Sequence, residues 1–203
     1  MNDDSTIIFI VDDDPSICSS LTRLISSIGF QAKSFTSAQE FLQHERPQGP
    51  CCLVLDIRLP GLGGLDLQDY LNSLPYNIPI IFITGYGSVP MSVRAIKHGA
   101  VDFLEKPFED QALLDAVQNA IEKDKQARHK EAEGVEIQKR IETLTPRERE
   151  VFALVVTGMM NKQIAAELGT SEKTVKVHRA RVMNKMQVAS LAELVRMAGK
   201  VNL

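Results

Sequence analysis

The first half of the sequence alternates short apolar runs with longer segments of helical periodicity, and this alternation restricts the possible folds more than any other feature. The apolar runs occupy residues 7–11, 51–55, 79–83 and 101–104, with a weaker candidate at 30–35. These runs are too short for helices, and their nearly continuous hydrophobicity is typical of strands buried on both faces. Five strands interleaved with helices predict an α/β domain in which helices cover both faces of a parallel sheet.

Helix start signals lie between these runs. Asp14 and Pro15 open one helical segment, and Ser37 with Glu40 forms a capping box that opens another. A capping aspartate accepts hydrogen bonds from the first backbone N–H groups of its helix. We therefore interpret Asp14 as a helix cap rather than as a metal ligand.

The pattern changes near residue 122. A fifth helix should begin near Glu109, and its apolar face ends at Ile121. That face consists of Leu113, Leu114, Val117 and Ile121. Residues 122–133 contain no large apolar side chain, so we predict that residues 123–142 form a linker that is helical in part and weakened at Gly134.

Residues 143–203 show helical patterns and no strand pattern. Thr145 and Pro146 start a first helix, residues 161–168 form a short helix ended by Gly169, and Ser171 caps a longer one. A short helix, a glycine-containing turn and a basic helix make the helix-turn-helix pattern. We therefore expect three parts: an α/β domain at 1–122, the linker at 123–142 and a small all-α domain at 143–203.

Charge separates the two halves. Residues 1–122 hold 7 Lys and Arg against 16 Asp and Glu, whereas residues 123–203 hold 16 against 10. Net charge is evidence about partners rather than about the fold. The second half is therefore the one expected to meet a polyanion such as double-stranded DNA.

No segment has the composition of a membrane span or a secretion signal. No window approaches the roughly 18 apolar residues that a membrane helix needs, and residues 1–6 are polar where a secretion signal would be basic and then apolar. Cys18, Cys51 and Cys52 lack the spacing of a metal site or a disulfide framework, so we interpret them as small buried hydrophobic residues. We expect a cytoplasmic protein that makes no contact with a membrane.

Carboxylates, a hydroxyl and an ammonium group follow the predicted strands. These groups belong to Asp12, Asp13, Asp56, Thr84 and Lys106. Because ligands bind outside the carboxyl ends of parallel strands, the five side chains should surround one crevice. Clustered carboxylates favour a bound cation, and an all-oxygen site suits Mg²⁺ or Mn²⁺. Asp56 can act as a nucleophile in phosphoryl transfer, with the metal ion, Lys106 and Thr84 on the phosphoryl oxygens.

Residues 7–122 resemble the receiver domains of two-component systems. The resemblance rests on Val11-Asp12-Asp13, Asp56-x-x-Leu59-Pro60-x-x-x-Gly64, Thr84-Gly85 and Lys106-Pro107. It implies a flavodoxin-like, doubly wound sheet in which Asp56 accepts phosphate from a sensor histidine kinase. Leu59 replaces the methionine that is usual before the proline, a change that conserves side-chain volume.

The same resemblance implies roles for neighbouring residues. The implied ligands of Mg²⁺ are Asp13, Asp56, the Arg58 carbonyl and, through water, Asp12. Phe103 matches the aromatic position that turns inward when Thr84 moves toward the phosphate. A surface pair of Lys106 with Glu105 is a plainer interpretation, but Lys106 closes a strand that faces the acidic cluster, and this position argues against it. For Phe103 the plainer interpretation, a core residue, stays open.

An aspartate-nucleophile phosphatase is a function of a different class that uses the same ion and a covalent aspartyl phosphate. Such enzymes usually carry a second acid two residues after the nucleophile, and this sequence has Arg58 there. We therefore predict that the chain is not an enzyme, apart from the self-phosphorylation and dephosphorylation of the receiver.

Residues 172–185 form a basic helical segment, E-K-T-V-K-V-H-R-A-R-V-M-N-K. Helical spacing places four residues on one face, namely Val175, His178, Val182 and Met186. Basic residues on the free face would neutralise phosphates, and those near the helix start can reach base edges in the major groove. We interpret His178 as a packed residue because no second metal ligand lies near it in the sequence.

The second half is similar to LuxR-type DNA-binding domains. The motifs are Leu144-Thr145-x-Arg147-Glu148-x-Glu150-Val151, Gly158-x-x-Asn161-Lys162-x-Ile164-Ala165 and Thr174-Val175-Lys176-x-His178. The resemblance implies that Lys176 and Val177 face bases. The residues that it places against the DNA backbone or neighbouring bases are Lys173, Thr174, Arg179 and Arg181. Ala180 is a lysine in some relatives, so their base preference does not transfer to this chain.

Further motifs resemble the FixJ branch of the FixJ/NarL response regulators. They are Thr84-Gly85-x-Gly87-x-Val89-Pro90-Met91-x-Val93 and Glu105-Lys106-Pro107-Phe108, with Ser88 where an aspartate is common. The resemblance implies a transcription regulator, in the first place an activator that works with RNA polymerase, whose phosphorylation promotes dimerisation and DNA binding. The implied dimer face presents four exposed apolar residues, Val93, Ile96, Leu113 and Val117.

A second mechanism stays open at this point. The unphosphorylated receiver could mask the DNA-binding surface, and phosphorylation would then release it. The long linker favours the dimer-driven mechanism.

Overall fold

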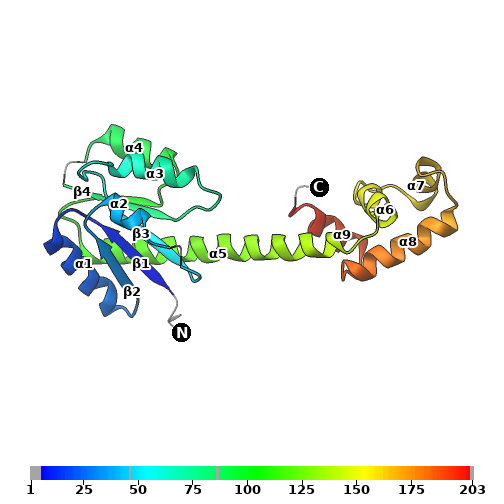
Figure 1. The fold of residues 1–203 in the computed structure, drawn as a ribbon, viewed down its shortest axis with the longest axis horizontal. Helices are drawn as coiled ribbons and strands as arrows, with labels where there is room; N and C mark the ends of the chain where they lie inside the picture. The colour runs from blue at the N-terminus through cyan, green and yellow to red at the C-terminus, as the bar shows by residue number, and fades with distance from the viewer. Residues whose placement is uncertain (1–5, 46, 86, 202–203) are drawn as a thin grey trace. The chain divides into compact units, whose positions relative to one another are not determined.

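Five parallel strands form the sheet that the apolar runs predict. In the computed structural model, which describes residues 6–45, 47–85 and 87–201, the strands are β1 (Ile7–Val11), β2 (Gln31–Phe35), β3 (Cys51–Asp56), β4 (Ile80–Thr84) and β5 (Asp102–Glu105). Figure 1 labels the first four of these strands. The order of all five in the sheet is β2-β1-β3-β4-β5. This is the doubly wound, flavodoxin-like order, and the predicted fold class is confirmed.

Helices cover both faces of this sheet. They are α1 (Pro15–Ser27), α2 (Ala38–Leu42), α3 (Gly64–Asn72), α4 (Val89–Lys97) and α5 (Asp110–Glu142). Helices α2, α3 and α4 lie on one face of the sheet, and α1 and the first turns of α5 on the other (Figure 1). Their buried side chains form one core on each face. Because side chains alternate along a strand, Cys51 lies in the first core and Cys52 in the second. Cys18, Cys51 and Cys52 are all buried and none of the three forms a disulfide bond, which agrees with the sequence-based interpretation.

Helix α5 is longer than the sequence pattern predicts. It runs through Gly134 as one helix to Glu142, whereas we predicted a partly helical linker after residue 122. Pairs of side chains four residues apart support the polar stretch, including Gln126 with Glu122 and Arg140 with Glu136. The chain divides into two compact units, Met1–Arg128 and His129–Leu203.

A buried carboxylate fixes the middle of α5 to the first unit. Asp124 is only 1% exposed, and its Oδ2 accepts hydrogen bonds from the backbone N–H of Cys51 (2.8 Å) and from Nε of Arg128 (2.6 Å). Arg128 also donates to the carbonyl of Gln48 at 3.0 Å. Residues 123–128 are therefore bound to the start of β3 rather than being free linker.

A fragment of residues 1–128 should consequently be more stable than a fragment of residues 1–122. Removing the last six residues leaves the buried N–H of Cys51 without the Asp124 carboxylate, which costs about 1–3 kcal/mol. Urea denaturation of the two fragments, followed by circular dichroism, measures the difference. Equal midpoints for the two fragments would show that the Asp124 contacts contribute nothing to the fold.

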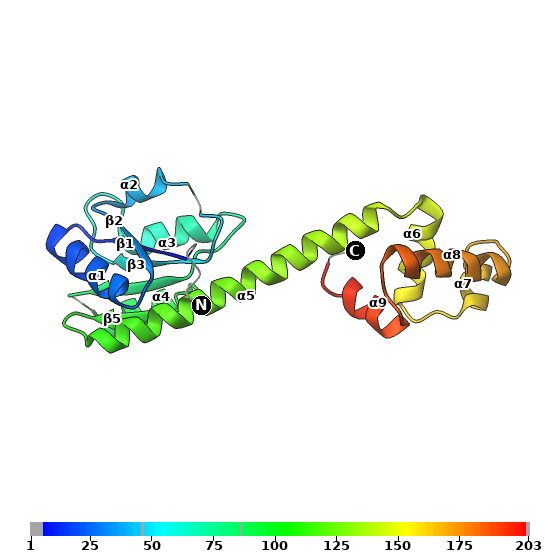
Figure 2. The same ribbon diagram turned by 90° about the horizontal axis from the view of Figure 1, so that it is seen from below.

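Four short helices and the end of α5 form the second unit. The four are α6 (Pro146–Val156), α7 (Asn161–Glu167), α8 (Glu172–Lys185) and α9 (Leu191–Ala198). Helix α8 packs against α6 and α7, and α9 packs against α6 (Figure 2). Gly169, with a φ of 60°, supplies the left-handed turn between α7 and α8, and this completes the predicted helix-turn-helix. None of the helices in the described ranges combines the length and the hydropathy that crossing a membrane requires.

Candidate functional site

The carboxyl ends of the strands bring the predicted polar residues together. Lys106, which follows β5, donates from Nζ to Oδ2 of Asp12 at 2.6 Å and to Oδ2 of Asp56 at 3.2 Å. Asp12 follows β1 and Asp56 ends β3, so three strand ends meet at one ammonium group. These contacts place Lys106 in the crevice and not in a surface pair with Glu105.

Three carboxylates form a compact acidic cluster. Asp12, Asp13 and Asp56 each offer an oxygen within 4.8 Å of the others, with Asp12 and Asp56 buried and Asp13 exposed. Backbone N–H groups orient the two buried carboxylates, because Asp14 donates to Asp12 at 3.0 Å and Arg58 donates to Asp56 at 3.1 Å. Such an all-oxygen donor set, partly open to water, fits a small hard cation.

Burial governs the electrostatics of this cluster. Burial raises the pKa of Asp12 above its ordinary value, and the hydrogen bond from Lys106 only partly opposes it. Burial also acts against the charge of Lys106, but the hydrogen bond to Asp12 and the charge of Asp56 outweigh it and raise the pKa of the amine. Lys106 is therefore charged at neutral pH. Its single positive charge is smaller than the negative charge that the three carboxylates can carry.

Two further positions shape the crevice. Thr84 ends β4, is fully buried, and accepts a hydrogen bond at its carbonyl from the backbone N–H of Lys106 at 2.8 Å. The start of α3 lies directly against β3, and a Cβ on Gly64 would overlap the carbonyl oxygen of Asp56 and lie 2.9 Å from Cα of Ile57. Glycine at position 64 therefore allows the start of α3 to lie close to the backbone of Asp56 and Ile57. This close contact holds the loop that follows Asp56.

Phe103 lies half-buried beside a cavity of about 340 Å³. The residues that line the cavity are Gly87, Ser88, Val89, Ser92, Phe103 and Glu105. Ser88 thus borders the same space as Phe103, at the start of α4. Position 86, which precedes this set of residues, lies outside the described ranges.

The predicted dimer face needs a correction. Val93 and Ile96 on α4 are exposed as expected, but Leu113 and Val117 on α5 are both 0% exposed. Their prediction as surface residues was wrong, because the apolar stripe of α5 is the face that packs under the sheet. Val89, which the sequence analysis did not include, is 76% exposed and continues the α4 row at positions 89, 93 and 96.

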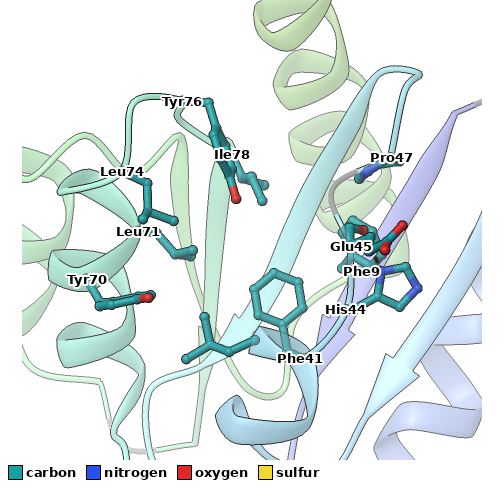
Figure 3. A pocket seen from close by; sticks show the side chains of 11 residues that line it. Phe9, Phe41, His44, Glu45, Pro47, Tyr70, Leu71, Leu74, Tyr76 and Ile78 are labelled. Atoms are coloured by element: carbon teal, nitrogen blue, oxygen red, sulfur yellow. Dashed lines mark hydrogen bonds between the residues drawn. The ribbon is translucent and has the colours of Figure 1, made fainter.

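A second cavity, of about 160 Å³, lies on the α2–α3 side of the sheet. Figure 3 shows Phe41, Tyr70, Leu71 and Tyr76 around it, and its lining includes none of the acidic cluster. It is therefore separate from the crevice at the strand ends.

Helix α8 presents the predicted basic surface. Ser171 caps it by accepting from the N–H of Thr174 at 3.1 Å. Val175, Val182 and Met186 are buried, and His178 is half-buried beside them. The exposed members of the predicted DNA-binding set are Lys173, Lys176, Val177 and Arg181, and the half-buried members are Thr174 and Arg179. Arg179 differs from the others because its Nη1 donates to Oδ1 of Asn161 on α7 at 3.0 Å.

Glu148 connects α6 to the end of α8. Its carboxylate accepts from the backbone N–H of Thr145 at 2.9 Å, which completes a capping box, and from Nζ of Lys185 at 2.6 Å. The Lys185 hydrogen bond, with help from Thr145, lowers the pKa of Glu148 to about 2. Glu148, which belongs to a motif of the sequence, is thus a structural residue that holds the C-terminal end of α8.

Replacing Glu148 by glutamine should destabilise the second unit at neutral pH by about 2 kcal/mol, because charged hydrogen bonds to Lys185 and Thr145 are lost. The folded-state pKa lies below the ordinary value of 4.5, so the carboxylate stabilises the fold above pH 4.5 and ceases to do so as the pH falls toward about 2. The gap in thermal midpoint between wild type and Glu148→Gln should therefore close across that range. Calorimetry measures it, with the exposed Glu150→Gln as control, and a gap independent of pH would contradict the assignment.

Comparisons with known proteins agree with this geometry. A model of the response regulator receiver domain matches residues 8–118, and a model of the luxR family of bacterial regulatory proteins matches residues 142–198. Nodulation protein W of Bradyrhizobium diazoefficiens is 55% identical over 192 residues, which is 95% of this chain and 85% of the relative. Transcriptional regulatory protein FixJ of Azorhizobium caulinodans is 44% identical over 195 residues, covering 96% and 92%. The solved structure of response regulator StyR matches with a TM-score of 0.83 at 46% identity, over 97% of this chain and 99% of that one.

Proposed function

Because the chain belongs to the two-component response regulators that combine a receiver domain with a LuxR-type DNA-binding domain, we propose that Asp56 accepts the phosphoryl group and that its phosphorylation controls DNA binding. The observation that carries this proposal is the position of Lys106, whose ammonium group bridges Asp12 and Asp56. The carboxylate of Asp56, at the end of a strand, can attack phosphorus. The charged lysine beside it can neutralise the phosphoryl oxygens of the product.

The acidic cluster fits a divalent cation, for which Mg²⁺ or Mn²⁺ is the natural choice. Asp13 and Asp56 would hold the ion directly, with Asp12 acting through water and the carbonyl of Arg58 as a further ligand. When bound, the ion supplies positive charge to the phosphoryl oxygens. The fit rests on two buried carboxylates and one exposed one that a single lysine does not neutralise.

Phosphoryl transfer needs little proton chemistry from the chain itself. An oxygen of Asp56 forms the new bond to phosphorus while the bond between phosphorus and the imidazole nitrogen of the kinase breaks, and the imidazole takes up a proton from water. Lys106 binds one phosphoryl oxygen and the Thr84 hydroxyl another. The product of the transfer is an aspartyl phosphate at position 56.

In the second unit, α8 is the helix that enters the major groove. Lys176 and Val177 face the bases, and the residues that lie against the DNA backbone or neighbouring bases are Lys173, Thr174, Arg179 and Arg181. The exposure of four of these six residues, together with the buried row on the opposite face, supports this orientation.

Replacing Lys176 by alanine should weaken binding to a target promoter about tenfold, since a base or phosphate contact is worth about 1–3 kcal/mol. The slope of affinity against salt concentration should decrease as well, because one cation fewer displaces counterions. Fluorescence anisotropy with labelled promoter DNA measures both quantities. Lys97→Ala, which removes an equal charge from α4, should leave both unchanged, and equal losses for the two variants would mean that only net charge matters.

Phosphorylation is proposed to promote a homodimer through the exposed row on α4, which contains Val93 and Ile96. A dimer presents two copies of α8 to two half-sites, and this arrangement suits an activator that recruits RNA polymerase. Release of a masked DNA-binding surface is the alternative. If residues 143–203 alone bind DNA as tightly as the phosphorylated full chain, masking explains the control and dimerisation does not.

Intact mass spectrometry after treatment with acetyl phosphate and Mg²⁺ tests the proposed phosphorylation. The wild-type chain should gain one phosphoryl group and Asp56→Asn none, while Asp115→Asn, an exposed aspartate on α5, should behave like wild type. No gain in the wild type would exclude the receiver function. Turnover of a generic phosphate monoester that Asp56→Asn abolishes would instead indicate a phosphatase.

A further inference from the structure

Helix α4 is held unevenly along its length. Ala95, near its C-terminus, is its one buried residue, whereas Val89 at its start is the most exposed of its apolar residues. Ser88, which precedes the helix, makes no side-chain cap hydrogen bond. The start of α4 borders the cavity beside Phe103, five residues after Thr84, and is therefore the loosely held end.

Two amide side chains of α3 hold the other end of α4. Nε2 of Gln68 donates to the carbonyl of Ala95 at 3.0 Å and to that of His98 at 3.3 Å, and Nδ2 of Asn72 donates to the carbonyl of His98 at 2.8 Å. The last carbonyls of a helix lack partners within the helix, so these donors complete its C-terminus. Asp69, between the two amides, adds an exposed ion pair to Arg94 at 2.9 Å and a 2.7 Å contact with Nδ1 of His98.

Gln68 carries a buried polar group that lowers the stability of the fold. It is 1% exposed, and its Oε1 is buried without a hydrogen-bond partner among the described residues. A buried unsatisfied carbonyl destabilises a protein, and an apolar side chain of similar volume would avoid that cost. The two hydrogen bonds that Gln68 donates are thus what distinguishes it from methionine or leucine at this position.

We propose that Gln68, assisted by Asn72, is a positioning residue that fixes the C-terminal end of α4 as a pivot. A conformational change at the other end of the helix, near Thr84, then tilts the exposed row at Val89, Val93 and Ile96. This inference rests on the proposed function of Asp56. A helix free at both ends would shift without a defined direction, whereas a helix fixed at one end converts a change at the other into rotation of its exposed face. The pivot therefore couples phosphorylation to DNA binding without touching either the phosphoryl group or the DNA.

The variant Gln68→Met tests the pivot because it preserves volume and removes both donated hydrogen bonds. We expect the full-length variant to take up phosphate from acetyl phosphate as the wild type does, and to bind DNA equally when unphosphorylated. The gain in DNA affinity upon phosphorylation should fall at least fivefold. Amide hydrogen exchange at residues 94–100 should become faster, including at the N–H of Ala100, which donates to the carbonyl of Ala95.

Asn72→Ala is a second, milder variant, since Asn72 is exposed and its loss does not threaten the core. Gln111→Met, the same substitution at an exposed position of α5, is the matched control and should keep the full gain. A normal gain in both Gln68→Met and Asn72→Ala would overturn the proposal. A wild type that takes up no phosphate would instead refute the proposed function of Asp56, so the two failures are distinguishable.

Discussion

Replacing Lys106 by alanine should slow the phosphorylation of the protein by acetyl phosphate about 100-fold, since the loss of one positioned donor to a developing charge typically costs a factor of about 10²–10³. The ammonium group contacts Asp12 and Asp56 in the resting site and is the cation that we assign to the phosphoryl oxygens. Its pKa is raised, so it stays charged at neutral pH and supplies this contact. A time course followed by intact mass measures the rate.

The matched control for this prediction is Lys97→Ala. Lys97 is an exposed lysine in the last turn of α4, away from the acidic cluster, and its loss changes net charge by the same amount. We expect the wild-type rate for this variant. If Lys106→Ala also reacts at the wild-type rate, Lys106 does not bind the phosphoryl group and its contacts serve only the resting fold.

Replacing Gly64 by alanine should destabilise the first unit by about 3 kcal/mol, the upper end of the range that is typical of overpacked buried sites. The added Cβ would overlap the carbonyl oxygen of Asp56, and the atoms that it meets all belong to the backbone of Asp56 and Ile57. The loop between β3 and α3 must then move, and Asp56 moves with it. We therefore expect slower phosphorylation as well as a lower midpoint in urea.

Gly134→Ala is the informative control because it should have the opposite sign. Gly134 lies in α5 with open space around it, and alanine favours a helix over glycine by up to about 1 kcal/mol. The two alanine substitutions therefore separate a steric requirement from a general effect of glycine replacement. Equal stability of Gly64→Ala and wild type would show that the approach of α3 to Asp56 is not close in solution.

The parallel sheet and the crevice were predictable because both follow from local patterns. Apolar runs of four to six residues, each followed by a polar or charged residue, mark buried strands and their ends. Once the strands are parallel, residues as far apart as Asp12 and Lys106 must meet at one edge. The caps at Asp14 and Ser37 were predictable for the same reason, since a cap acts within a few residues.

The parts that the sequence did not reveal depend on partners far away in the chain. Asp124 reads as an ordinary solvated residue of a polar helix, and only the N–H of Cys51 explains its burial. Gln68 likewise reads as surface, although it lies under the end of α4. Leu113 and Val117 were assigned to a surface because the resemblance pointed to that helix, but an apolar stripe on an amphipathic helix is first of all the face that packs.

The most direct test of the account is the DNA affinity of the full-length protein before and after phosphorylation, with wild type and Asp56→Asn compared on promoter fragments selected from genomic DNA. Fluorescence anisotropy gives the affinity, and intact mass on the same samples gives the phosphorylated fraction. Phosphorylated wild type should bind at least about tenfold more tightly than the unphosphorylated protein, which is within the usual range of coupling between two sites, and Asp56→Asn should show no change. Equal affinity of fully phosphorylated and unphosphorylated wild type would contradict the claim that Asp56 controls DNA binding.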